Sequence, residues 1–198
     1  CTAQTLESNT HDFNIVYDRV LVESELVFDV SQQVNFELDL PEDYSGLSLY
    51  VNDDLKEPVI ENNKLKLLYD SVKKIKFDYL TDELLDKDIF LANIVVPFDT
   101  GDFRITVTLP EEAVLEKPLG NGISGSIYPK PNKAITDGKS LIFEWDKHNI
   151  TKGDDQAIFI QYRTKADYGF LLWSFALIII GLLMYIISRK PKVETVVH

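Results

Sequence analysis

Cysteine is almost absent from this chain of 198 residues, since the single one is Cys1. No disulfide can therefore form within the chain, and a structural zinc site is disfavoured because such sites usually use several cysteines. Only three histidines are present, His11, His148 and His198, and no two of them have the spacing of metal ligands. We expect them in an N-terminal tail, in a loop and at the C terminus. The sequence predicts no cofactor and no metal.

Basic residues are scarce as well, with 20 Lys and Arg against 32 Asp and Glu, a net charge of −12. An acidic surface repels phosphate backbones, so binding to nucleic acid is disfavoured. No G-x-S-x-G sequence occurs, and no histidine is placed to activate a serine nucleophile. We therefore expect a protein that is not an enzyme and that binds no nucleic acid.

Two further patterns suggest ligand sites and are better explained otherwise. Residues 120–125 match G-x-G-x-x-G, but Pro129 and Pro131 follow and forbid the helix that would hold a pyrophosphate. We interpret this stretch as a surface loop. Acidic clusters at 52–54, 99–102 and 154–155 lack the spacing of an EF-hand, and we interpret them as solvated turns.

The clearest positive signal is an internal echo. Residues 28–43, FDVSQQVNFELDLPED, reappear one residue shorter as residues 98–112, FDTGDFRITVTLPEE. Two further matches follow in the same order, 60–70 with 135–146 and 76–81 with 159–164. The offset grows slowly along the chain, as loop insertions between equivalent strands would make it. The echo predicts two copies of one fold.

Apolar and polar residues alternate in most of these segments, for example at 34–40 and 103–109, which indicates half-buried strands. We predict an all-β ectodomain of two tandem β-sandwich domains of the same fold, followed by one C-terminal transmembrane α-helix. The predicted organisation is a flexible tether (1–11), copy 1 (12–81), a linker (82–88), copy 2 (89–164), the span (168–187) and a tail (188–198).

The predicted span is an uncharged apolar run that would reach about 30 Å as a helix, enough to cross a bilayer. Basic residues follow it, which predicts a cytoplasmic C terminus and an extracytoplasmic N terminus in the cell membrane. Small residues spaced by seven, Ser174, Gly181 and Ser188, would pack against another helix. The residues expected at the membrane interface are Tyr168, Trp173, Tyr185, Arg189, Lys190 and Lys192.

Two positions are candidates for modification. Cys1 fits the mature N terminus of a lipoprotein, whose thiol carries lipid and would contact the membrane. The alternative is that the sequence simply starts there. Asn149, Ile150 and Thr151 form an N-glycosylation sequon in an expected exposed turn.

The strings at 96–115 and 126–145 resemble extracytoplasmic β-domains that precede a C-terminal span in archaeal cell-envelope proteins. The resemblance covers about residues 89–164 and carries no catalytic residue over. In architecture alone, two tandem β-domains before one span are also similar to ribophorin I of the oligosaccharyltransferase. These resemblances imply a surface-exposed, non-enzymatic role.

The expected function is that of a non-catalytic, single-pass accessory or structural subunit. Its tandem β-domains would bind other membrane or cell-envelope proteins, with a hetero-oligomer favoured over a monomer. One alternative is a ligand- or cation-binding ectodomain that serves a neighbouring transporter. Another is a surface-layer or adhesion component.

Overall fold

The computed structural model describes residues 4–117, 125–164, 177–180 and 184–185. The chain divides into two compact units, residues 1–164 and residues 165–198, and the strands all belong to the first. In chain order the strands are β1 (Thr5–Val16), β2 (Arg19–Asp39), β3 (Ser45–Val51), β4 (Asp54–Lys56), β5 (Val59–Glu61), β6 (Lys64–Thr81), β7 (Leu85–Asp86), β8 (Ile89–Val95), β9 (Asp99–Thr108), β10 (Val114–Leu115), β11 (Ile127–Tyr128), β12 (Lys133–Thr136), β13 (Leu141–Ile150) and β14 (Asp155–Arg163).

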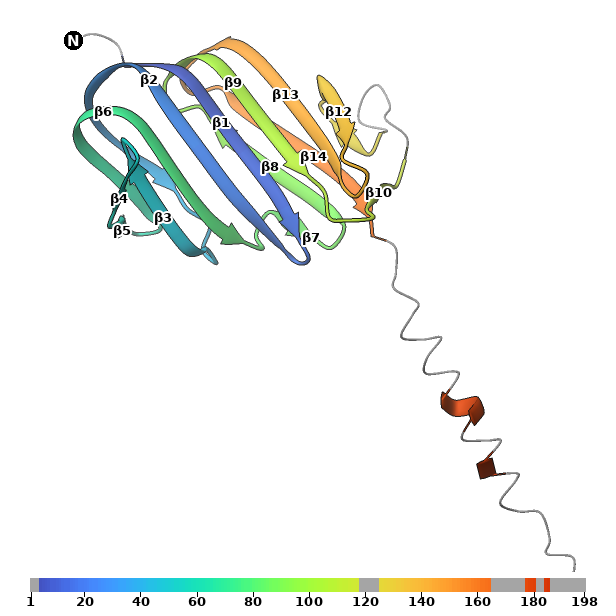
Figure 1. Ribbon diagram of the computed structural model, residues 1–198. Helices are drawn as coiled ribbons and strands as arrows, with labels where there is room; N and C mark the ends of the chain where they lie inside the picture. The colour runs from blue at the N-terminus through green and yellow to red at the C-terminus, as the bar shows by residue number, and fades with distance from the viewer. Residues whose placement is uncertain (1–3, 118–124, 165–176, 181–183, 186–198) are drawn as a thin grey trace, which may run out of the picture. The chain divides into compact units, whose positions relative to one another are not determined.

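These strands form two sheets (Figure 1). The nine-stranded sheet runs in the order β12-β13-β9-β1-β2-β6-β3-β4, with β5 also paired to β6. The five-stranded sheet runs β10-β14-β8-β7, with β11 also paired to β14. The pair of β1 with β9 is parallel and joins segments that are distant in sequence. The fold is all-β and resembles a two-sheet sandwich, so this part of the fold prediction is confirmed.

The interior holds two hydrophobic cores on the same side of the large sheet. The first core lies between the two sheets and includes the fully buried Phe90, Phe143 and Ile160. The second core is enclosed mainly by strands of the large sheet and includes Phe28 and Leu49, also fully buried. Burial of each such side chain contributes about 1.5–3 kcal/mol.

The second core is covered by a bend in the two longest strands. The ribbons of β2 and β6 curve near the edge of the large sheet at which β3, β4 and β5 lie (Figure 1). Their pairing shifts register between Val27 and Val34, and Ser71 adopts a φ of 54° at the bend. Beyond it, residues 33–39 of β2 and 64–69 of β6 form what we call the distal arm. Its inward side chains Val34 and Leu67 are buried in the second core.

The prediction of two tandem β-sandwich domains of the same fold is wrong. One continuous sheet takes strands from both halves of the chain. The echo is locally real, because β2 pairs with β6 and β6 with β5 just as β9 pairs with β13 and β13 with β12. The last echoed segments diverge: 76–81 belong to β6 in the large sheet, whereas 159–163 belong to β14 in the small one. The sequence repeats a strand arrangement and not a domain.

The N-terminal segment also differs from the prediction. Residues 5–11, expected within a flexible tether, form the first part of β1 and pair with both β2 and β9. Leu6, Asn9 and His11 are buried there. The segment has the polar composition of a flexible tail, because its outward side chains are polar and two of its three buried side chains, Asn9 and His11, are also polar.

The prediction of a transmembrane helix over 168–187 is also corrected. Of this range the structure describes 177–180 and 184–185, which are helical, and no helix among the described residues is long and apolar enough to cross a membrane. The predicted single-pass placement in the cell membrane, with its extracytoplasmic N terminus, is therefore withdrawn. An uncharged run meets the length requirement for a span, but composition alone does not fix one continuous helix.

Candidate functional site

An open groove of about 380 Å³ lies where the two cores meet, and we call it the inter-core groove. One wall is the distal arm, with Glu37, Leu38 and Asp39, and the other is β8, which contributes residues 92–95. The floor includes His11. Its remaining floor residues come from both cores and from the polar boundary between them: Phe13, Val22, Ser24, Leu26, Phe77 and Tyr79. A groove of this size and mixed lining lies within the range of ligand-binding sites.

A polar seam of Asn9, His11 and Ser24 separates the cores at this floor. The three side chains face inward from β1 and β2, and His11 stands directly opposite Ser24 in the strand pairing. The Nδ1 atom of His11 lies 2.8 Å from Oγ of Ser24. Burial lowers the pKa of His11 to about 4, so the ring is neutral at neutral pH.

The seam is incompletely hydrogen-bonded. Within the described part of the chain, the side-chain amide of Asn9 and the Nε2 atom of His11 have no hydrogen-bond partner, although all are buried. An unsatisfied buried polar group costs about 1–3 kcal/mol. Apolar residues at these positions would join the two cores, so this polar boundary lowers the stability of the interior.

His11 and Ser24 are residue types that form a base and a nucleophile in serine hydrolases. The pair lacks the features that would activate the serine. Ser24 is 2% exposed and His11 is 9% exposed. A histidine whose pKa is about 4 is a weak base at neutral pH, and among the described residues no carboxylate bonds to Nε2 to orient the ring. The pair is therefore better suited to lie beneath a bound group, as a polar part of the groove floor, than to perform catalysis.

The electrostatic character of the groove is acidic. The described residues that line it include the carboxylates of Glu37 and Asp39 and no Lys or Arg. Lys64 approaches Asp39 to 3.2 Å from the neighbouring strand, but both side chains are largely solvated and such a pair is weak. Burial, with help from the charges of Asp43 and Glu83, raises the pKa of Tyr79 on the floor to about 12. The groove is therefore suited to apolar and cationic groups.

Sequence reasoning missed this site because it placed His11 in a tail. The signal that could have found it is the alternation of apolar residues in the segment that follows, where Phe13 and Ile15 are two residues apart. If the same period of two is extended backward, His11 and Asn9 share the inward face of Phe13.

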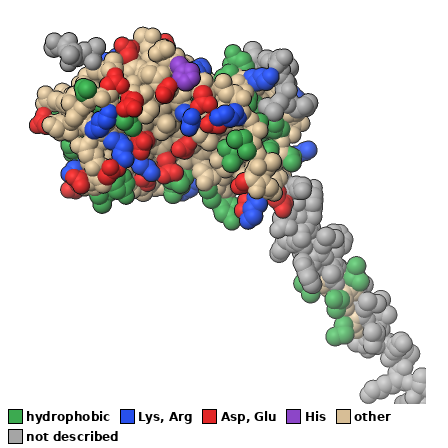
Figure 2. All heavy atoms as spheres, turned by 45° about the horizontal axis from the view of Figure 1, so that its top comes forward, with side chains coloured by type: hydrophobic (Ala, Val, Ile, Leu, Met, Phe, Trp, Pro, Cys, Tyr) green, Lys and Arg blue, Asp and Glu red, His purple; other side chains and the backbone are tan. Residues whose placement is uncertain are grey.

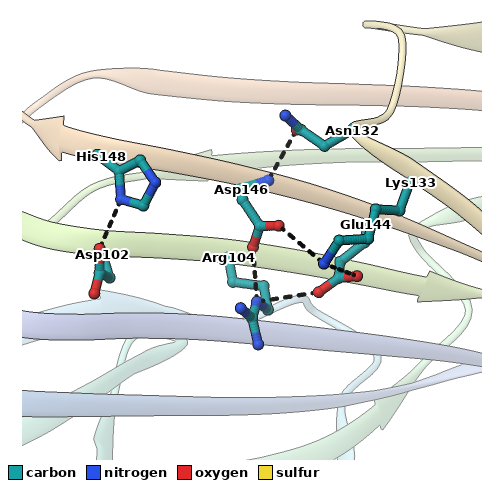
Figure 3. A network of polar contacts seen from close by, with 7 residues as sticks. All are labelled: Asp102, Arg104, Asn132, Lys133, Glu144, Asp146 and His148. Atoms are coloured by element: carbon teal, nitrogen blue, oxygen red, sulfur yellow. Dashed lines mark hydrogen bonds and ion pairs between the residues drawn. The ribbon is translucent and has the colours of Figure 1, made fainter.

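A second polar cluster lies on the outer face of β9, β12 and β13 (Figure 3). The Nε atom of Arg104 is 2.7 Å from Asp146 and 3.3 Å from Glu144, and Nζ of Lys133 is 3.1 Å from Glu144. The hydrogen bond from Arg104 lowers the pKa of Asp146. Acidic and basic side chains are interspersed over this face of the molecule (Figure 2). These charges are paired with one another, so we regard the cluster as a solvated surface and not as a site.

The other predicted positions are separate from the groove. Asn149 is exposed near the end of β13 with a φ of 54°, and its glycosylation stays a prediction. His148 lies on the outer face, with Nδ1 2.7 Å from Asp102. In the acidic clusters, Asp99 accepts a hydrogen bond from the amide of Lys152. No group of three His, Cys, Asp or Glu side chains among the described residues could hold a metal ion.

Several predicted positions lie outside the described residues. Most of the predicted loop 120–125 is among them, because residues 120–124 are not described. So are the predicted lipidation, helix-packing and most interface positions: Cys1, Tyr168, Trp173, Ser174, Gly181, Ser188, Arg189, Lys190 and Lys192, together with His198. Tyr185 is described and is 54% exposed.

Comparisons with known proteins show the fold and no family. No family model matches the sequence, and no curated protein matches it. The structure is similar to an M1 zinc metallopeptidase from Deinococcus radiodurans, with a TM-score of 0.50 and 10% identity over 80% of this chain and 43% of that chain. A putative protease from Parabacteroides distasonis aligns with a TM-score of 0.45 and 11% identity, over 82% of this chain and 41% of that chain. The chain thus spans less than half the length of either protein, and at this identity the first similarity shows the fold alone.

Proposed function

We propose that the β unit is a non-catalytic accessory module that binds a partner protein, with the inter-core groove as its binding site. The observation that carries the proposal is the groove itself, which is largely apolar within apart from His11 and Ser24, acidic at its rim and open between two well-packed cores. Rigid walls around a concave apolar surface are what a partner segment needs for affinity. The module would act in a hetero-oligomer.

The state of the polar seam supports a binding role over catalysis. An active serine nucleophile needs an accessible hydroxyl and a base held in one orientation. Ser24 is almost fully buried, and His11 has a pKa of about 4 with its Nε2 unbonded among the described residues.

Two tryptophan substitutions on the same strand test the proposal. Ile94 lines the groove and is half-buried, whereas Leu91 is 57% exposed on the opposite face of β8. Ile94→Trp should fill the groove and lower recovery of the partner at least about tenfold, because loss of contacts at the centre of an interface costs about 2 kcal/mol or more and about 1.4 kcal/mol is already tenfold. Leu91→Trp adds the same ring outside the groove and should leave recovery unchanged.

The measurement is quantitative affinity purification of the tagged full chain from cells that express it, followed by mass spectrometry. Thermal melts of both variants confirm that they remain folded. If Ile94→Trp retains every stoichiometric partner that the wild type retains, the groove is not the binding site. If Leu91→Trp alone loses the partner, the outer face of the small sheet binds it instead.

A further inference from the structure

One wall of the inter-core groove is an unpaired strand edge. β8 pairs with β14 over its whole length, Ile89–Val95, whereas β7 covers its other edge only at Ile89 and Phe90. The next contact on that edge is the hydrogen bond from the amide of Leu91 to the carbonyl of Leu84, at 3.0 Å. Beyond Leu91, no strand within the described residues covers this edge.

The alternating direction of the backbone groups along β8 shows which N–H and C=O groups are free. The amide of Val96 donates to Asp154 on the side of β14, so residues 92 and 94 also point toward β14. Because successive residues of a strand direct their N–H and C=O groups to opposite edges, Asn93 and Val95 direct theirs to the uncovered edge. Leu84 and residues 92–95 all line the groove, so it occupies the place that a longer β7 would fill.

The facing wall is also an uncovered edge. The amide of Leu40 donates to Asn63, so the even-numbered residues of the distal arm bond to β6. Glu37 and Asp39 therefore direct their backbone groups to the other edge, where the described strands provide no partner. Two unpaired edges thus face one groove.

Proteins normally protect such edges with lysine, proline or a bulge, because exposed edges recruit other strands. Residues 91–95 are Leu, Ala, Asn, Ile and Val, and they pair with β14 in one unbroken register. The groove beside them contains two carboxylates and, among its described lining residues, no Lys or Arg. An extended segment with basic side chains would match both the edge and the charge.

We propose that the inter-core groove binds an extended segment of a partner polypeptide, which adds as a strand to β8 at Asn93 and Val95. Alternate residues of the segment contact the apolar floor, and a lysine or arginine faces Glu37 and Asp39. This inference rests on the proposed function and specifies its mode of recognition and the chemistry of the partner segment.

The sharpest test replaces one backbone amide. Asn93→Pro removes an N–H group that has no partner in the described structure, so the edge strand should tolerate it while strand addition fails. Asn93→Ala removes the same side chain but keeps the amide. The probe is a capped peptide of alternating valine and lysine, added to the full chain and compared with its valine and glutamate counterpart.

We expect the basic peptide to bind Asn93→Ala like the wild type and to bind Asn93→Pro about tenfold more weakly, a loss of about 1.4 kcal/mol, since the hydrogen bond from the amide is lost and its partner carbonyl is left unpaired. Glu37→Gln should weaken the basic peptide several-fold and reduce the salt dependence of its binding. Hydrogen exchange at Asn93 and Val95 should slow when the peptide is bound, while exchange at residues 92 and 94 stays as it was.

Undiminished binding to Asn93→Pro would overturn strand addition, and equal binding of the two peptides would overturn the charge assignment. Absence of peptide binding, or no added protection at Asn93 and Val95, would overturn the inference as a whole. If Ile94→Trp loses the partner while Asn93→Pro keeps it, the groove remains the binding site and strand addition alone fails.

Discussion

The two cores of this molecule are buried by different means. The first is closed by a second sheet, so its side chains come from strands that are far apart in sequence, such as β1, β8, β9 and β14. The second is closed by the large sheet itself, which bends so that the distal arm lies over β3 and β6. Neither cover reaches the boundary between them, and the polar seam and the inter-core groove lie there. The groove thus arises because one face of the large sheet is covered partly by the small sheet and partly by its own bent strands.

The largest expected effects come from truncating one aromatic in each core. Phe90→Ala in the first core and Phe28→Ala in the second should each lower the free energy of unfolding by about 3–5 kcal/mol, because both rings are fully buried. Since β2 and β6 are shared by the cores, each variant should unfold in a single transition in urea. A separate early transition for Phe28→Ala would mean that the second core folds independently.

A smaller effect should come from His11 at the boundary between the cores. Its pKa is lowered by burial from 6.5 to about 4. As the pH falls from 6.5 toward 4, the unfolded chain binds a proton that the folded chain does not bind, so the free energy of unfolding falls by about 3 kcal/mol or less. This contribution is fully present above pH 6.5.

The neutral replacement His11→Gln isolates this effect from the titration of carboxylates. Urea denaturation at several pH values should show a weaker loss of stability between pH 6.5 and 4 in the variant than in the wild type. A variant that loses stability as steeply as the wild type would show that His11 is not buried in neutral form.

The smallest effect should come from the outer face, where charges are paired in solvent. Arg104→Ala removes a side chain that is 53% exposed, so the free energy of unfolding should change by less than about 1 kcal/mol. Partner recovery should be unchanged, because this face lies outside the groove. A loss above about 2 kcal/mol would show that the outer cluster supports the sheet as strongly as a core residue.

Local structure could be predicted from the sequence, and pairing at long range could not. Alternation at 34–40 and 103–109 identified parts of β2 and β9, and the echoed segments 60–70 and 135–146 each contain a turn between strands that do pair. These signals concern neighbours in the chain. The parallel pairing of β1 with β9 leaves no such signal, because parallel neighbours need no turn between them. The repeated segments therefore predict two domains, although one sheet takes strands from both halves of the chain.

The groove was beyond prediction for a related reason. Glu37 and Asn93 come from different sheets, and only the bend near Ser71 and the short length of β7 bring an uncovered edge to each wall. His11 was within reach of the period-two pattern but was excluded because its flanking residues are polar. A buried polar seam breaks the rule that inward positions are apolar, which is why composition pointed to a tail.

The most direct test of partner binding in the inter-core groove is photo-crosslinking in cells, with a benzophenone amino acid placed at residue 93 or at residue 104 of the full chain. Asn93 is an exposed residue that lines the groove, whereas Arg104 lies on the outer face of the large sheet. A discrete crosslinked partner should form from residue 93 and none from residue 104. Crosslinking from residue 104 with none from residue 93 would contradict binding in the groove.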